Sequence, residues 1–123
     1  MKHLLQLEEL AQFAACILGL YYFGAHLPWW AWVPLFFSPD LGMVGYLVSS
    51  AFGGMLYNLF HHKAIAIAAI VIGFFMDDGG WLTAGLILYG HSSFDRVFGY
   101  GLKYPDNFKH THLGWLPSKK GKN

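Results

Sequence analysis

Two long stretches of the chain carry almost no charge. Residues 10–60 contain one formally charged side chain, Asp40, and residues 64–94 contain only Asp77 and Asp78. Hydrophobic residues make up 55% of the 123 residues and charged residues 12%, roughly half the charged share of an ordinary soluble domain. Because a soluble fold this small cannot bury so much apolar surface, both stretches are expected to lie in the hydrocarbon of a lipid bilayer.

The predicted fold is an all-α, polytopic membrane helical bundle with about four transmembrane helices. A helical span needs about 20 apolar residues, and the segments that fit or approach this length are residues 4–23, 41–60, 64–76 and 81–98. Between the first two lies PWWAWVPLFFSPD, whose tryptophans suit a membrane interface and whose prolines discourage a long helix. This stretch is expected to form a short interfacial or re-entrant helix.

The placement of the basic residues predicts the topology. Six of the eight lie at or beyond the end of the last apolar segment. By the positive-inside tendency, the C-terminal tail is expected to be cytoplasmic. With four spans, the N-terminus and the HHK turn at residues 61–63 lie on the same side, and the acidic DDGG turn at residues 77–80 faces outward. The predicted location is therefore multi-pass in a cell membrane with both termini cytoplasmic.

The same pattern divides the chain into three parts and limits its partners. Residues 1–98 are expected to form the transmembrane bundle, residues 99–117 an ordered juxtamembrane cap, and residues 118–123 a flexible basic tail. A basic tail also suits nucleic acid, but the bilayer-length segments before it favour a membrane anchor. The expected partners are the lipid bilayer and either further copies of the chain or a larger membrane complex, without nucleic acid.

Two polar motifs near the ends of predicted spans carry the residue types of a metal site. In YNLFHH, Asn58 and His61 are three residues apart, and in HSSFDR, His91 and Asp95 are four apart, so each pair shares a helix face. Two imidazoles and a carboxylate are a conventional ligand set for zinc, iron or manganese. The sequence therefore predicts a divalent metal site at His61, His91, Asp95 and Asn58, near the cytoplasmic face.

Spacing alone leaves the membership of this cluster open. His62 is as well spaced from Asn58 as His61 is, and Glu8 or Asp40 could supply a further oxygen ligand. A purely structural reading also stands, in which the polar groups hydrogen-bond one another and lipid headgroups at the interface. The pairs HxxxD and HTH, the latter containing His110 and His112, are weak metal patterns because they arise often by chance.

The depth of Asp40 depends on the continuity of the helix that follows it. A continuous helix over residues 41–60 would hold Asp40 about 30 Å from His61 and exclude a shared site. If glycine and serine instead break that helix near residue 50, the segment forms a half-length hairpin. Asp40 would then lie at depth, where it could join the cluster.

Three sequence stretches together resemble a known family. SPDLGMVGYL, MLYNLFHH and HSSFDRVFGYGLKYPDNFKHTHLG are similar to domain-of-unknown-function family 4260, and the resemblance extends over nearly the entire chain. That family comprises small proteins of the bacterial inner membrane. The resemblance implies an integral membrane protein of this type, and it assigns no activity to any residue.

The favoured functional reading is a membrane-embedded, metal-dependent hydrolase acting on a lipid-like substrate. The predicted ligands would hold the ion, a bound water would be the nucleophile, and Asp40 or Glu8 would act as base. Arg96 and Lys103, beyond the last span, would steady a phosphate or an oxyanion. Snorkelling anchorage of these two cations at the membrane surface is the simpler reading.

Two non-enzymatic readings remain as alternatives. The polar cluster could be the coordination or proton-relay site of an ion or small-molecule transporter, with the glycine-rich segment permitting movement. It could also be structural, in an accessory subunit of a larger membrane complex whose glycine faces are packing surfaces. Neither a dinucleotide fingerprint nor a phosphate-binding loop occurs in the sequence.

Overall fold

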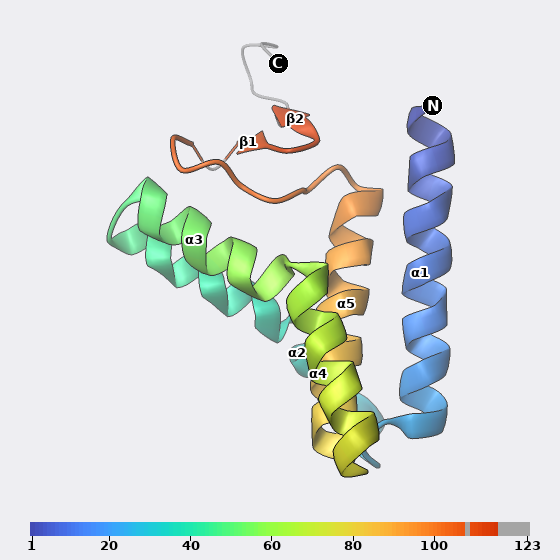
Figure 1. Ribbon diagram of the computed structural model, residues 1–123. Helices are drawn as coiled ribbons and strands as arrows, with labels where there is room; N and C mark the ends of the chain where they lie inside the picture. The colour runs from blue at the N-terminus through green and yellow to red at the C-terminus, as the bar shows by residue number, and fades with distance from the viewer. Residues whose placement is uncertain (108, 116–123) are drawn as a thin grey trace.

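The computed structural model describes residues 1–107 and 109–115, and this part of the chain is almost entirely helical (Figure 1). A short antiparallel hairpin follows the last helix. The elements are α1 (Lys2–Phe23), α2 (Trp29–Phe37), the 3₁₀-helix η1 (Ser38–Leu47), α3 (Ser50–His61), α4 (Lys63–Met76), α5 (Gly79–Val97), β1 (His110–Thr111) and β2 (Gly114–Trp115). The prediction of an all-α fold is confirmed.

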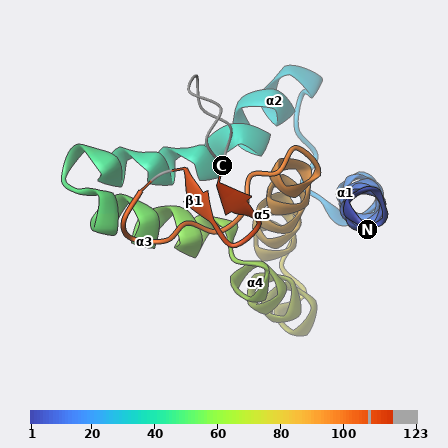
Figure 2. The same cartoon turned by 90° about the horizontal axis from the view of Figure 1, so that it is seen from above.

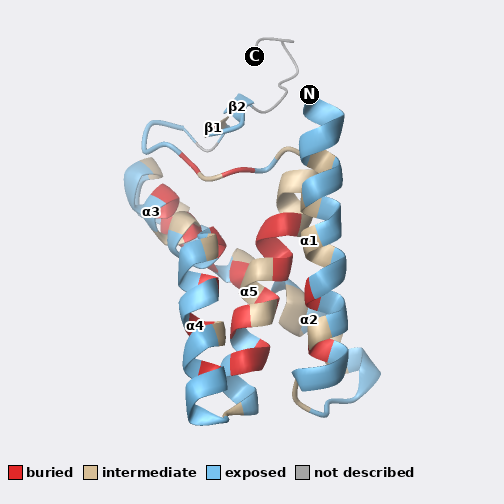
Figure 3. Ribbon diagram, turned by 45° about the vertical axis from the view of Figure 1, so that its right-hand side comes forward, coloured by how far each residue is buried: buried red, intermediate tan, exposed pale blue. Residues whose placement is uncertain are grey.

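Helix α5 is the centre of the arrangement. It lies between α1 and α4 and contacts both along their length (Figures 1 and 3). Among the described elements, α5 buries the most residues, between Leu82 and Ser93, whereas α1 buries only Cys16 and Leu20. The side chains that α5 presents to its neighbours therefore determine where a buried site can form.

Helices η1 and α3 form a second unit beside this bundle. They pack against each other as a hairpin that extends away from α5, as the view from above shows (Figure 2). Gly45 and Gly53 make the close approach possible, because a Cβ at position 45 would lie 3.0 Å from the Gly53 Cα. The inner end of this hairpin brings Asp40 and His61 to α5.

Three of the helices begin directly after a residue whose side chain caps them. The Ser49 side chain accepts a hydrogen bond from the Phe52 N–H at 3.0 Å and so caps α3. His62 caps α4 in the same way through the Ala64 N–H, at 3.1 Å. Asp78 caps α5 by accepting from the N–H groups of Gly80 and Trp81. The starts of α3, α4 and α5 are therefore each marked by a capping residue at the boundary.

The prediction of a continuous helix over residues 41–60 is wrong. The chain is 3₁₀-helical over η1, leaves helical structure at Val48 and Ser49, and resumes as α3 at Ser50. Pro39, the glycines of η1 and the Ser49 cap all disfavour one long α-helix here. The half-length hairpin is the arrangement observed, and Asp40 lies at its inner end.

The two ends of the helical bundle are formed by different parts of the chain. The N-terminus and the segment after α5 lie at one end of the bundle, and the turn between α4 and α5 lies at the other (Figure 1). Within the predicted cap, Lys103 and Thr111 pair as an antiparallel bridge. Residues 116–117 of that cap and the predicted flexible tail, residues 118–123, lie outside the described residues.

Large apolar side chains are exposed over α1 and α4. By length and hydropathy α1 can cross a membrane, and α3 with α4 can do so as one span bent by 41°. Among the described helices, one or at most two candidate spans are thus found. Four separate transmembrane helices remain a prediction.

The contact between α4 and α5 generates a stability prediction. A Cβ at Gly85 would lie 2.7 Å from the Ile70 nitrogen and 2.8 Å from the Ala66 carbonyl oxygen. Both are backbone atoms, whose displacement is energetically costly. We expect Gly85→Ala to lower the free energy of unfolding by about 1–3 kcal/mol, measured as a reduced melting temperature in detergent. Gly79→Ala is the matched control because no atom lies within 4 Å of its Cβ. Equal melting temperatures for the two variants would contradict the close packing of α4 on α5.

Candidate metal centre

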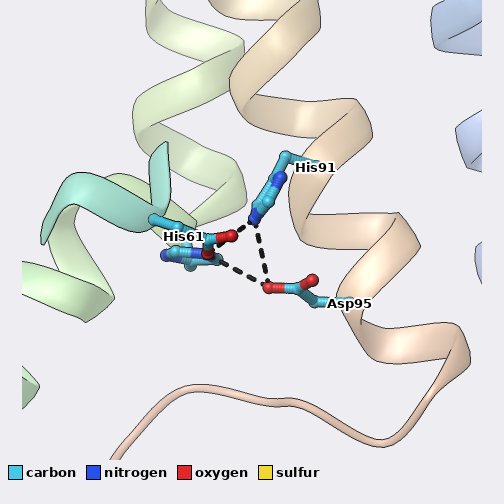
Figure 4. Close-up of side chains that lie close together, drawn as sticks. His61, His91 and Asp95 are labelled. Carbon is cyan, nitrogen blue, oxygen red and sulfur yellow. Dashed lines mark hydrogen bonds and ion pairs between the residues drawn. The ribbon is translucent and has the colours of Figure 1, made fainter. Parts of the chain in front are cut away.

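Four side chains from three separate elements meet beside the middle of the bundle. Asp40 comes from η1, His61 is the last residue of α3, and His91 and Asp95 lie one turn apart on α5. One ligand atom from each of the four lies within 4.8 Å of all the others. Figure 4 shows His61, His91 and Asp95 pointing toward one another. The predicted imidazoles thus converge from different helices, joined by two carboxylates.

The distances between nitrogen and oxygen atoms match the edges of a small coordination shell. The Nε2 atom of His61 lies 3.4 Å from Asp40 Oδ1 and 3.2 Å from Asp95 Oδ2. The Nε2 atom of His91 lies 3.0 and 3.3 Å from the same two oxygens. For a tetrahedral ion with bonds of about 2.0–2.2 Å, adjacent ligand atoms are separated by roughly 3.3–3.6 Å. Small outward movements would therefore seat a divalent ion among these atoms.

Backbone carbonyls fix the tautomer of both imidazoles. His61 donates its Nδ1–H to the Tyr57 carbonyl at 2.8 Å, and His91 donates its Nδ1–H to the Phe36 carbonyl at 3.0 Å. A carbonyl can only accept, so the proton of each neutral ring must lie on Nδ1. Both Nε2 lone pairs then face the carboxylate oxygens.

This arrangement requires a positive charge between its members. A lone pair that faces a carboxylate at about 3 Å is repelled unless a proton or a metal ion lies between the two. His91 Nε2 has hydrogen-bonding geometry with Asp40 Oδ1, at 3.0 Å. His61 Nε2 is buried and makes no hydrogen bond within the described part of the chain. An additional proton can stabilise part of the cluster, and one divalent ion can satisfy all four ligands.

Tyr57 supports two of the four side chains. Its ring stacks on the His61 ring with a centroid distance of 3.8 Å and an interplanar angle of 7°. Its hydroxyl donates a hydrogen bond to Asp95 Oδ2 at 3.3 Å. Since its carbonyl also holds His61 Nδ1, this residue orients both ligands. Sequence reasoning did not assign Tyr57 a role, although its spacing of four residues from His61 placed it on the same helix face.

The cluster is buried on its histidine side and open at Asp40. His61 and His91 are 3% and 1% exposed, whereas the Asp40 side chain is 42% exposed. The rings of Phe36 and Phe37 lie 5.4 and 6.0 Å from the His91 ring and form an apolar wall. Ligands held in this way are shielded from water, while a small molecule can approach past Asp40.

Asn58, predicted as a ligand, lies outside the cluster. Its side-chain amide donates to the Lys103 carbonyl at 2.7 Å, and its side-chain oxygen accepts from the Lys103 N–H at 2.6 Å. These two hydrogen bonds resemble those between paired β-strands, and they hold the segment after α5 against α3. Asn58 therefore positions Lys103, and Asp40 is the fourth member of the cluster.

Lys103 is buried close to the cluster. It is 4% exposed, and its ammonium lies 4.7 Å from the centroid of the Tyr57 ring, the ring that stacks on His61. Burial lowers the pKa of the Lys103 ammonium to about 8, against the opposing influence of the Asp95 carboxylate. The second predicted cation, Arg96, is half-buried in the last turn of α5, next to Asp95.

The remaining candidate residues have other surroundings. Glu8 is exposed on α1 and does not belong to the cluster; its neighbour Glu9 pairs with Lys63 at 2.6 Å. His62 is exposed and caps α4. Among the described residues, the four-residue group is thus the one candidate metal centre.

The two histidines of the HTH motif, His110 and His112, also lie outside the four-residue group. His110 stacks on Trp115 with a centroid distance of 4.4 Å and bonds to Asp106 through Nδ1. His112 accepts the Leu102 N–H on its Nδ1 at 2.8 Å. Both act within the segment that covers the end of the bundle, away from the four-residue group.

Comparison with known proteins gives one match. No curated protein and no solved structure matches the chain. A family model described as a domain of unknown function, DUF4260, matches residues 2–116 and so includes all four members of the cluster. The chain therefore belongs to domain-of-unknown-function family 4260.

Proposed function

We propose that this protein is a membrane-embedded, metal-dependent hydrolase that acts on a lipid-like amphiphile. The observation that carries the proposal is the convergence of two Nε2 lone pairs and two carboxylate oxygens within 4.8 Å. Both rings are already held in the tautomer that a metal requires. Histidine and carboxylate ligands of this kind suit zinc, iron(II) or manganese(II).

The two aspartates differ in exposure, which suggests that one binds the ion and the other acts as the base. Catalytic metal sites keep three protein ligands and one open position. In this proposal His61, His91 and Asp95 hold the ion, because all three are well covered. Asp40 is partly exposed and lies at the mouth, so it accepts the proton of the water that occupies the open position.

The reaction is the addition of water across an ester bond. The water oxygen forms a bond to the acyl carbon or phosphorus atom, and its proton passes to the Asp40 carboxylate. The bond to the leaving oxygen breaks with its electron pair, and that oxygen takes the proton from Asp40. The products are an acid and an alcohol, and Asp40 returns to its ionised form.

The membrane location is part of the proposal and rests on the exposed apolar surface. In this arrangement α1, α2 with η1, the bent pair of α3 and α4, and α5 cross the bilayer in turn, with both termini on the cytoplasmic side. The helix breaks near Ser38 and His62 then lie beside the cluster. An amphiphile in the inner leaflet of a bacterial membrane would reach Asp40 without leaving the bilayer.

One observation favours a second candidate function, ion transport. The four ligands lie where two apolar segments are interrupted, and discontinuous helices of this kind form the ion sites of secondary transporters. In that case the ion is the cargo and Asp40 is the ligand that admits it. Metal-dependent turnover of an ester substrate distinguishes the hydrolase from this alternative.

Metal content gives the first prediction for the candidate metal centre. Protein purified in detergent and supplied with zinc is expected to hold one ion per chain, counted by elemental analysis after dialysis. His91→Ala should lose most of this metal, because it removes a ligand from the buried side of the cluster. His110→Ala is the control, since His110 lies in the cap. Equal zinc in His91→Ala and wild type would contradict a metal centre at these residues.

Asp40 gives the second prediction. Asp40→Asn should keep at least half of the bound zinc, because three ligands remain. Hydrolysis of short-chain esters and phosphodiesters by the zinc-loaded protein should fall about 10²–10⁴-fold, the usual contribution of a general base. Wild-type rates in Asp40→Asn would exclude Asp40 as the base. Metal binding without turnover of any such substrate in the wild type would favour transport instead.

Tyr57 gives the third prediction. Tyr57→Phe keeps the ring on His61 and removes only the hydroxyl contact with Asp95. Loss of such a supporting hydrogen bond commonly weakens metal binding about 10–100-fold. Competition with a chelator of known affinity measures the change, and Tyr100→Phe in the covering segment serves as control. An unchanged zinc affinity would show that the hydroxyl does not orient Asp95.

A further inference from the structure

We propose that the pocket between α1 and α2 holds one linear acyl chain of the substrate and so places the ester bond of that substrate at Asp40. This inference rests on the proposed hydrolase function and names the substrate class for it. The pocket has a volume of about 720 Å³, within the usual range for small-molecule sites. Its walls come from both helices and include Phe13, Ile17 and Leu20 of α1 and Val33, Phe36 and Phe37 of α2.

The pocket is long and closed at one end. Helices α1 and α2 both pack on α5 but hardly contact each other, and the connection between them closes the pocket at Gly24, Ala25 and His26. The Ala25 N–H donates a hydrogen bond to the Thr83 hydroxyl of α5 at 2.8 Å, which fixes this closed end. Phe13 and Gly24, at the two ends of the α1 wall, are eleven positions apart, or roughly 16 Å of helix. An extended chain of about 12 carbons has this length, since each carbon–carbon bond of about 1.5 Å advances it by about 1.3 Å.

The lining of the pocket suits a hydrocarbon chain better than a headgroup. No Asp, Glu, Lys or Arg side chain is among the described residues that line it. Most of its wall is aliphatic or aromatic, and His26 lies in the connection at the closed end. A charged or strongly polar group in such a place would lose its hydration without gaining enough hydrogen-bond partners. A linear acyl chain loses nothing by entering it.

The other end of the pocket adjoins the candidate metal centre. The rings of Phe36 and Phe37 line the pocket, and they lie 5.4 and 6.0 Å from the His91 ring. Asp40 follows Phe37 by three residues, which is one turn of 3₁₀-helix, so the two side chains share a face. Phe37 is exposed, and Asp40 Oδ1 lies 3.0 Å from His91 Nε2. A chain that leaves the pocket over Phe37 therefore brings its ester bond to Asp40.

The contribution of the pocket is to position the substrate. Lipid tails are as apolar as the pocket, so a chain that moves from the bilayer into it gains little from the hydrophobic effect. A chain held along α1 instead restricts where the ester bond can lie. Remote binding of this kind is used to orient the reacting group, and truncated substrates lose turnover. A 12-carbon ester is thus expected to react faster than an acetyl ester.

The first measurement compares hydrolysis of 4-nitrophenyl dodecanoate and 4-nitrophenyl acetate by the zinc-loaded protein in an uncharged detergent. The rate ratio of the two esters is compared between variants, because partition of the esters into micelles affects all variants equally. Val33→Trp and Ile17→Trp, which narrow the pocket from opposite walls, should each lower the dodecanoate-to-acetate ratio at least tenfold. Val71→Trp, at an exposed position of α4 outside the pocket, is the matched control and should keep the wild-type ratio. Melting temperatures show whether each variant is folded.

The second measurement locates the chain without any turnover. Metal-free protein is mixed with a phosphatidylcholine whose 12-carbon chain carries a diazirine at its end, and it is then illuminated. Mass spectrometry is expected to find the cross-link concentrated at residues 20–27, around the closed end of the pocket. Val33→Trp should reduce this cross-link at least tenfold, and Val71→Trp should not.

The outcomes separate this inference from the proposed function. A cross-link at residues 20–27 together with a lowered rate ratio in the two pocket variants supports the inference. A cross-link there with an unchanged ratio overturns it, because the bound chain then belongs to a resident lipid. A cross-link spread over the exposed surfaces of α1 and α4 also overturns it. In both of these cases turnover of the acetate ester leaves the hydrolase standing. A zinc-loaded wild type that hydrolyses neither ester contradicts the proposed function and this inference together.

Discussion

The donation of two imidazole N–H groups to backbone carbonyls is the interaction on which the candidate site depends. The Phe36 carbonyl is open to His91 for a specific reason. In a 3₁₀ pattern the residue three positions later would donate to it, but that residue is Pro39, which has no N–H. The Tyr57 carbonyl lies in the last turn of α3, where it accepts a hydrogen bond from the Nδ1–H of His61. The ends of two short helices thereby set the direction of both Nε2 lone pairs.

The same helix ends bring the carboxylates into place. Because η1 begins directly after α2, Asp40 follows the Phe36 carbonyl by only four residues and reaches His91 as well. Ser92 donates its hydroxyl to the His61 carbonyl at 2.8 Å and ties the end of α3 to α5. The close glycine contacts within the hairpin of η1 and α3 keep Asp40 and His61 at the same level. An uninterrupted second span would have separated these two residues and left only three of the four members of the cluster together.

The sequence predicted the parts of this site that depend on local spacing. His91 and Asp95 share a face of α5, and their meeting with His61 followed from placing both motifs at the same end of the bundle. The role of Asp40 could not be decided in advance, because it depended on a break at residues 48–49 and hence on tertiary packing. Asn58 has the spacing of a ligand, yet its amide pairs better with the Lys103 backbone, a contact across 45 residues. The support from Tyr57 combines a ring, a hydroxyl and a carbonyl, which no spacing rule can anticipate.

Binding of one metal ion by His61 and His91 through Nε2, together with aspartate oxygens, is the proposal on which the others depend. X-ray absorption at the zinc edge, on protein loaded with one equivalent of zinc in detergent, measures this coordination directly. We expect a first shell of nitrogen and oxygen at about 2.0–2.2 Å, with outer-shell scattering from two imidazole rings that falls to one ring in His61→Gln. A shell of oxygen alone without imidazole scattering, or a spectrum unchanged by His61→Gln, would contradict it.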